Sequence, residues 1–274
     1  MKRIALVGLL MWAAPHSLAA ASEAWFAPTL LRNTYQQLAQ GHPLLAWHEL
    51  SLALQSHSID EQHWLAVKKV ILSRTQCGQA LPLLLSVPAA VTVSFIDKTN
   101  QSFRGHQVKI AVELLRRPVM ITLRDPQGNV LLEHAFEPVG SGSWEQDYLE
   151  AESAELLAPF TSGLYALTID GRSVPLVIAA SESSHWAESD VRDPQRVSLN
   201  LPSTTSGCAP AQAQWQYFDR QFELLDAQPV AADTENVFPP APQQARWQSV
   251  SVMQSEYQGS IRIHRVQRLT QPVN

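Results

Sequence analysis

The chain has 274 residues, of which 45% are hydrophobic and 16% charged, with a net charge of −5. These values are typical of a folded globular protein and exclude a disordered polypeptide. Nucleic-acid binding requires clustered Lys and Arg. The only basic run is residues 262–268, where basic and apolar residues alternate as in a strand with a basic outer face. The composition and this pattern therefore argue against nucleic-acid binding.

Residues 1–21 are typical of a secretory signal peptide. Lys2 and Arg3 precede a short apolar run, and small residues lead to Ala21. The run is shorter than the ~20 apolar residues of a membrane span. We therefore expect cleavage after Ala21, export to the periplasm or beyond, and a mature chain with 25 acids against 18 bases. No transmembrane segment is expected in that mature chain.

Residues 22–80 are predicted to be a helical N-terminal region. Apolar residues recur at helical spacing from Leu30 to Leu38 and again at residues 44–54. The third helix is expected to start at a capping box, with Ser58 as the cap and Glu61 reaching back to its amide. Cys77-Gly78 is expected to end this helix, with Gly in the left-handed conformation.

Residues 81–180 are predicted to be antiparallel β-structure. Asp170-Gly171 is a strong hairpin signal, and Pro126 and Gly128 mark a second turn. Short strands separated by such turns predict an all-β sandwich. The expected strands are residues 91–96, 108–114, 119–123, 130–136, 163–169 and 173–178.

The segment at residues 162–167 resembles a strand of immunoglobulin-like sandwiches, and the resemblance covers about residues 88–180. It implies that Tyr165 bonds back to the backbone and that Leu167 faces the core. Leu167 stands where antibody-type domains have a cysteine, so the inter-sheet disulfide of those domains is not expected. Fold alone implies no activity.

A polar linker is expected at residues 181–195, followed by a second, smaller β-module at residues 196–274. A Pro- and Ala-rich loop is expected at residues 229–242. The strands of this module are predicted at residues 196–201, 214–224, 246–253 and 260–266, and its core as Trp215, Phe218, Phe222, Val250, Val252, Ile261 and Ile263. The fold class is therefore α+β, mainly β.

The two cysteines, Cys77 and Cys208, are expected to form a disulfide, because an even pair in an oxidising compartment is normally bridged. The bridge would join the end of the helical region to the C-terminal third of the chain. Two free thiols are the alternative.

No catalytic residue, metal site or cofactor is predicted. Residues 139–143 lack the Gly-x-Ser-x-Gly frame of a nucleophile elbow, and Leu52 stands where a zincin starting at His48 needs its second ligand. The acidic residues between Glu145 and Glu155 are expected on a solvated loop or short helix. No Gly-rich phosphate loop or Asp-x-Asp-x-Asp calcium loop occurs.

Four aromatic residues are the binding candidates: Trp144, Trp186, Trp247 and Tyr257. Aromatic faces stack on sugar rings, and exposed apolar patches mark binding sites. Burial in a core is the alternative for each of them. Trp186 in the polar linker and Tyr257 in an expected turn fit that alternative least well.

The layout of leader, Cys77, Cys208 and a Trp-rich C-terminal hairpin resembles an uncharacterised family of secreted Gram-negative envelope proteins that pair N-terminal helices with β-modules. The resemblance implies no activity. We expect a non-enzymatic envelope protein that binds another envelope protein or a cell-wall component. The alternatives are a carbohydrate-binding module that recognises cell-wall glycan, a hydrolase whose site is built from scattered residues, and a structural scaffold.

Overall fold

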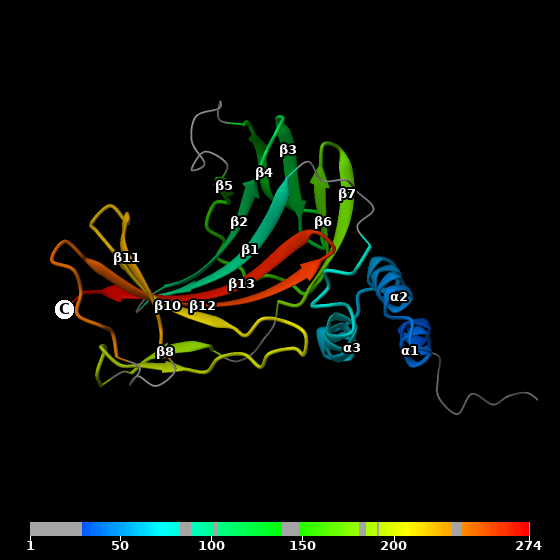
Figure 1. Ribbon diagram of the computed structural model, residues 1–274, viewed down its shortest axis with the longest axis horizontal. Coiled ribbons are helices and arrows are strands. Elements are labelled where there is room, and N and C mark those ends of the chain that lie inside the picture. The colour runs from blue at the N-terminus through cyan, green and yellow to red at the C-terminus, as the bar shows by residue number, and fades with distance from the viewer. Residues whose placement is uncertain are drawn as a thin grey trace, which may run out of the picture.

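The computed structural model describes residues 29–82, 89–100, 103–138, 148–180, 185–190, 192–231 and 237–273. Three helices come first, followed by a mainly β region, as predicted (Figure 1). The helices are α1 (Arg32–Ala39), α2 (Pro43–Ser56) and α3 (Glu61–Ser73). The strands are β1 (Ala90–Thr99), β2 (Arg104–Glu113), β3 (Val119–Arg124), β4 (Val130–Phe136), β5 (Tyr148–Glu152), β6 (Gly163–Ile169), β7 (Arg172–Ile178), β8 (Ala187–Ser189), β9 (Val197–Leu199), β10 (Gln212–Phe218), β11 (Leu224–Pro229), β12 (Trp247–Gln258) and β13 (Ile261–Pro272).

The start of α3 differs from the predicted capping box. Asp60, and not Ser58, is the N-cap, and its carboxylate accepts a hydrogen bond of 3.0 Å from the amide of Gln62. Glu61 is buried and accepts hydrogen bonds from the Ser162 hydroxyl and the Ala180 amide. Because the Glu61 carboxylate is held by the β region, it does not reach back to the Ser58 amide. The capping box therefore does not form, and the Asp60 side chain caps the helix.

The strands form two main sheets and one small pair. The larger, strongly curled sheet has the order β11-β10-β12-β13-β1-β2-β5, and the smaller one has the order β4-β3-β6-β7, while β8 pairs with β9 (Figure 1). The C-terminal hairpin β12–β13 was expected in a module of its own. Instead, β13 pairs in parallel with β1 over nine residues, so the hairpin lies at the centre of the larger sheet.

Three clusters of apolar side chains lie around these sheets. The largest fills the space between the two main sheets, and a second packs the helices on β7 through Val177. The third, under the β10–β12 part of the larger sheet, contains Trp215, Tyr217 and Phe238. Ile261 and Ile263 belong to the first cluster, because the parallel pairing with β1 carries them into the sandwich.

Two further expectations are corrected. Residues 148–152, predicted as part of an acidic loop or short helix, form the edge strand β5 because the backbone pairs with β2; Glu145 lies outside the described residues. Phe222, predicted in a core, is 56% exposed, because the segment expected as one long strand turns at Asp219 and returns as β11.

Tyr165 makes the backbone contact that the sequence suggested. Its hydroxyl donates a hydrogen bond of 2.7 Å to the Thr161 carbonyl, and Leu167 is fully buried. Burial raises the pKa of Tyr165 to about 12, because the charged phenolate would lie in a poorly solvated place.

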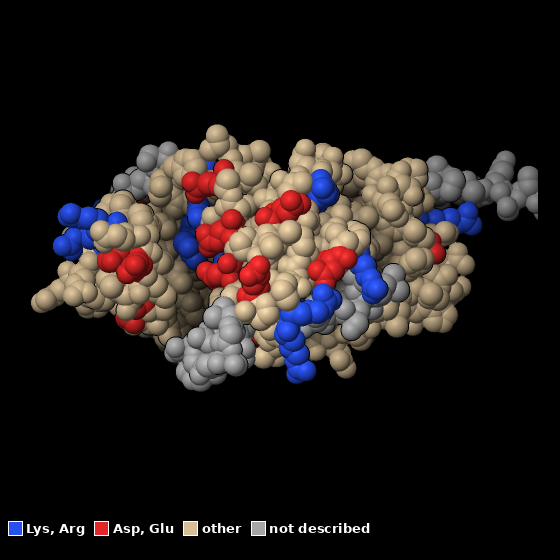
Figure 2. All heavy atoms as spheres, turned by 90° about the horizontal axis from the view of Figure 1, so that it is seen from above, with Lys and Arg blue, Asp and Glu red and all other residues tan. Residues whose placement is uncertain are grey.

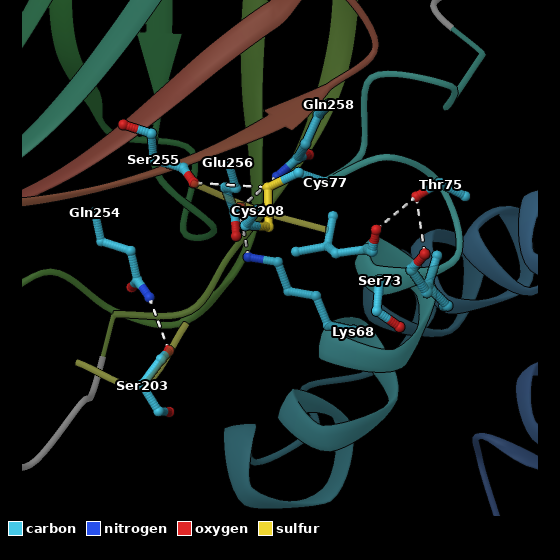
Figure 3. Close-up of a disulfide and its surroundings, with 12 residues drawn as sticks. Lys68, Ser73, Thr75, Cys77, Ser203, Cys208, Gln254, Ser255, Glu256 and Gln258 are labelled. Atoms are coloured by element: carbon cyan, nitrogen blue, oxygen red, sulfur yellow. Dashed lines mark hydrogen bonds and ion pairs between the residues drawn. A yellow bond between two sulfur atoms is a disulfide. The ribbon is translucent and has the colours of Figure 1, made fainter. Parts of the chain in front are cut away.

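The predicted disulfide between Cys77 and Cys208 is present, and it joins the segment after α3 to the loop before β10 (Figure 3). The same segment contacts the tip of the β12–β13 hairpin, where the Tyr257 amide donates to the Cys77 carbonyl at 2.9 Å. Gly78 has a φ of +86°, and a Cβ atom there would lie 1.8 Å from the Tyr257 carbonyl oxygen. Only glycine at this position allows the segment after α3 to come this close to the β12–β13 hairpin.

Candidate functional site

One face of the larger sheet, here called the inner face, changes from apolar to polar and back along its central strands. On β1, Val91, Val93 and Phe95 face the sandwich core, and Asp97 follows on the same face. On β13, Gln267 lies beside Asp97, and Leu269 then joins the third cluster. The inner face therefore has two apolar ends and a polar band between them.

A cavity of about 610 Å³ lies over this polar band. Its wall comes from the ends of β1 and β13, the start of β2, strand β8, and loop residues Pro159 and Phe160. The volume falls in the ~300–1,000 Å³ range of small-ligand sites. The wall combines carboxylates, imidazoles, guanidiniums and amides with the ring of Phe160.

Asp97 and His106 face each other across the β1–β2 pair in this wall. His106 Nδ1 lies 2.6 Å from Asp97 Oδ1, and His106 is buried. The Phe160 ring meets the imidazole edge-on, with 5.6 Å between ring centres. The carboxylate therefore fixes the orientation of the imidazole.

Arg104, at the start of β2, lies at the open side of the cavity next to His185. Its Nη2 atom is 3.4 Å from Nδ1 and 3.3 Å from Nε2 of that imidazole. Both side chains are exposed. Within the described ranges, Arg104 forms no ion pair with a carboxylate.

Amide side chains of β13 hold the segment that covers the other side of the cavity. Gln267 accepts a hydrogen bond of 2.7 Å from the Trp186 amide. Gln271 donates to the Pro194 carbonyl and contacts the Ser189 hydroxyl at 3.4 Å. Within the described part of the expected linker, Trp186, Ser189 and Pro194 are thus bonded to the sheet, and residues 185 and 187–189 form part of the cavity wall.

The three predicted aromatic residues that the structure describes, Trp186, Trp247 and Tyr257, do not form one site. Trp186 is fully buried, with the Arg265 guanidinium over its ring at 5.5 Å, so it offers no exposed stacking face. Trp247 stacks on Phe222 at 5.0 Å between ring centres, and Tyr257 lies ten residues further along β12. Trp144 lies outside the described residues. The cavity wall contains His185 and Ala187 but not Trp186 itself.

The cavity residues Asp97, Arg104, His106 and His185 were missed at the level of sequence. A signal was present, because Asp97 and His106 occupy positions where the alternation of β1 and β2 calls for apolar residues. Burying a charged side chain on the apolar face of a strand costs free energy unless the charge is paired, so such a residue can indicate a functional site.

The opposite, outer face of the sheet is also charged. Figure 2 shows Lys and Arg side chains in a hollow towards the β11 end of the molecule, with Asp and Glu side chains beside it. On β13 this face carries Arg262, His264 and Arg268, and the Arg268 Nε donates to the Ser251 hydroxyl at 3.1 Å. Burial and the nearby Arg262 lower the pKa of His264 to about 4.

The pKa of His264 predicts a loss of stability in acid. Between pH 6.5 and about 4 the unfolded chain takes up a proton on this imidazole and the folded chain does not, so stability falls as pH falls. We expect the urea midpoint of His264→Gln to fall less than that of the wild type between about pH 7 and pH 4.5. The exposed His48→Gln variant is the control, and parallel pH profiles for wild type and His264→Gln would contradict the prediction.

Two other kinds of feature are absent from the described residues. No group of three or more His, Cys, Asp or Glu is placed to hold a metal ion. No helix in this part of the chain is long and apolar enough to cross a membrane.

Residues 25–274 match the model of the family described as "Protein of unknown function (DUF2861)". No curated protein matches the chain.

Proposed function

The chain belongs to the DUF2861 family, and we propose that it is an exported, non-enzymatic protein of the cell envelope that binds a cell-wall component in the cavity on the inner face of its larger sheet. The observation that carries the proposal is the cavity of about 610 Å³, whose wall combines charged and amide side chains with apolar surface that includes the Phe160 ring. Sugars present hydroxyls to polar groups and C–H faces to rings, so this wall suits a glycan.

Export is part of the proposal and has two supports. The first is the leader pattern of residues 1–21. The second is the Cys77–Cys208 disulfide, since such bridges persist in oxidising compartments such as the periplasm. We also propose that the two packed sheets form an immunoglobulin-like sandwich, which the Tyr165–Thr161 hydrogen bond supports.

A cavity-filling variant tests the binding proposal. Thr99 lies in the cavity wall at the end of β1, and Thr99→Trp would occupy part of the space. In sedimentation with purified cell-wall sacculi, we expect the wild type to be found in the pellet. The amount of Thr99→Trp in the pellet should be about tenfold lower. Ser173→Trp, an equal change at an exposed position of β7, is the control and should bind like the wild type.

Two outcomes would overturn the proposal. One is no retention of the wild type on sacculi at low or moderate salt. The other is equal retention of Thr99→Trp with an unchanged melting curve, which would place any binding outside the cavity.

A second candidate function is hydrolysis of the same ligand, and the Asp97–His106 pair favours it. An imidazole oriented by a carboxylate is the arrangement of a general base. Release of soluble fragments from sacculi by the wild type, and its loss in His106→Gln, would establish the hydrolase. Binding without release supports the non-enzymatic protein.

A further inference from the structure

The cations and carboxylates of the cavity wall are unevenly paired. Asp97 is engaged by His106 at 2.6 Å, so its charge is already met by a hydrogen-bond donor. Arg104, at the open side, contacts the His185 ring through Nη2 and forms no ion pair with any carboxylate of the described residues. A guanidinium has five N–H groups in a planar fork, and the imidazole contact involves one nitrogen atom.

Such a guanidinium is suited to an anion with two oxygens. Arginine binds carboxylate and phosphate in a bidentate manner, and these charge-assisted bonds are stronger than neutral ones. Asp97 and Glu188 also line the cavity, and their carboxylates would repel a doubly charged phosphate more than a singly charged group. A carboxylate is therefore the better fit to Arg104.

The rest of the wall suggests what carries that carboxylate. Phe160 offers an apolar ring that is held in place by edge contacts with Phe95 and His106, at 5.1 and 5.6 Å between ring centres. Gln267 and Gln271, whose side-chain amides hold the segment that contains β8, line the other side of the cavity. A ring with hydroxyl or amide substituents and one acidic group would meet each of these features.

We propose that the cavity recognises a carboxylate-bearing ligand, with Arg104 as the bidentate donor and His185 as the residue that positions its guanidinium. This inference rests on the proposed binding function and adds the chemical class of the ligand. The carboxylate can come from an acidic amino sugar or from a peptide, and the experiment separates these sources.

Matched probes isolate the carboxylate. N-acetylmuramic acid and N-acetylglucosamine share a sugar ring and differ by a lactyl group that carries the carboxylate. Alanyl-alanine and its C-terminal amide form the corresponding peptide pair. Affinities are measured by titration calorimetry on the full chain with its disulfide intact.

We expect the wild type to bind the acidic member of one pair about tenfold more tightly than the neutral member, since a hydrogen-bonded charge pair contributes on this scale. Arg104→Gln should remove this preference by weakening binding of the acidic member more than binding of the neutral member, and Arg104→Lys should keep part of it. Arg220→Gln, an exposed arginine in the β10–β11 turn, is the control and should bind like the wild type.

The possible outcomes separate the carboxylate inference from the binding function on which it rests. Preference for the acidic sugar or for the acidic peptide supports carboxylate recognition and identifies the source. Equal affinity for the acidic and neutral members of both pairs overturns the carboxylate inference, while binding of the two sugars would leave the glycan-binding function standing. A preference that survives in a folded Arg104→Gln variant excludes Arg104 as the donor. No binding of any probe, together with no retention on sacculi, overturns both.

Discussion

Replacing both cysteines in Cys77→Ser/Cys208→Ser is expected to lower the free energy of unfolding by about 4–5 kcal/mol. The bridge closes a loop with a sequence separation of 131 residues, and in the chain-entropy model the effect of a cross-link grows with loop length. For a chain of this size the melting temperature should fall by roughly 10–15 °C. The measurement is thermal unfolding of the variant and of the wild type, with and without reductant.

The loss should be largest in the loop that Cys208 anchors. Besides the disulfide, a hydrogen bond of 3.4 Å from the Gln254 side-chain Nε2 to the Ser203 carbonyl ties this loop to β12 (Figure 3). Hydrogen exchange of the amides near Cys208 should therefore accelerate on reduction, while the centre of β13 stays protected. Reductant should not affect the double variant, which serves as the control. A wild type that melts at the same temperature when fully reduced would refute the prediction.

Glu256→Gln is expected to destabilise the fold by about 3–5 kcal/mol, because it removes the partner of a buried cation. Lys68 Nζ lies 2.7 Å from Glu256 Oε1, and the lysine side chain is only 4% exposed (Figure 3). The pair joins α3 to the end of β12, beside the disulfide. Without the carboxylate, the ammonium would have no opposite charge beside it in a poorly solvated place.

The double variant Lys68→Met/Glu256→Leu tests whether this cost comes from the unpaired charge. Apolar groups of similar size often replace a buried ion pair with little loss, so we expect the double variant to be more stable than Glu256→Gln alone. Lys109→Met breaks a comparatively exposed pair with Glu150 on the outer face and should cost less than about 1 kcal/mol. Urea unfolding of the three variants gives the comparison. If Glu256→Gln costs no more than Lys109→Met, the buried pair does not stabilise the junction.

Local patterns predicted most of the regular structure of this chain. Alternation and turn residues placed β3, β4, β6 and β7 within one or two residues, because each of these strands has a clear apolar face and a turn on at least one side. The disulfide was also predicted, since two cysteines allow one pairing. The start of α3 was misplaced because Ser58 and Asp60 are both good caps, and the contact between Glu61 and Ser162, which decides between them, spans 101 residues.

The candidate site could not be predicted because it depends on register between distant strands. Asp97 and His106 belong to adjacent strands and could have been paired from the hairpin alone. Gln267 reaches the same cavity only through the parallel pairing of β1 with β13, which no local pattern indicates. The prediction of Trp186 as a binding residue was wrong, because tertiary packing buries its ring under the Arg265 guanidinium.

The parallel pairing of β1 with β13 has a consequence for how the molecule folds. Val91 and Ile261 are register partners although 170 residues separate them in the chain (91 to 261). During synthesis β1 and β2 therefore leave the ribosome long before the strand that completes the middle of their sheet. Such high contact order slows folding and leaves an unprotected strand edge open to mispairing in the meantime. The middle of the larger sheet can therefore be completed only after nearly the whole chain has been synthesised.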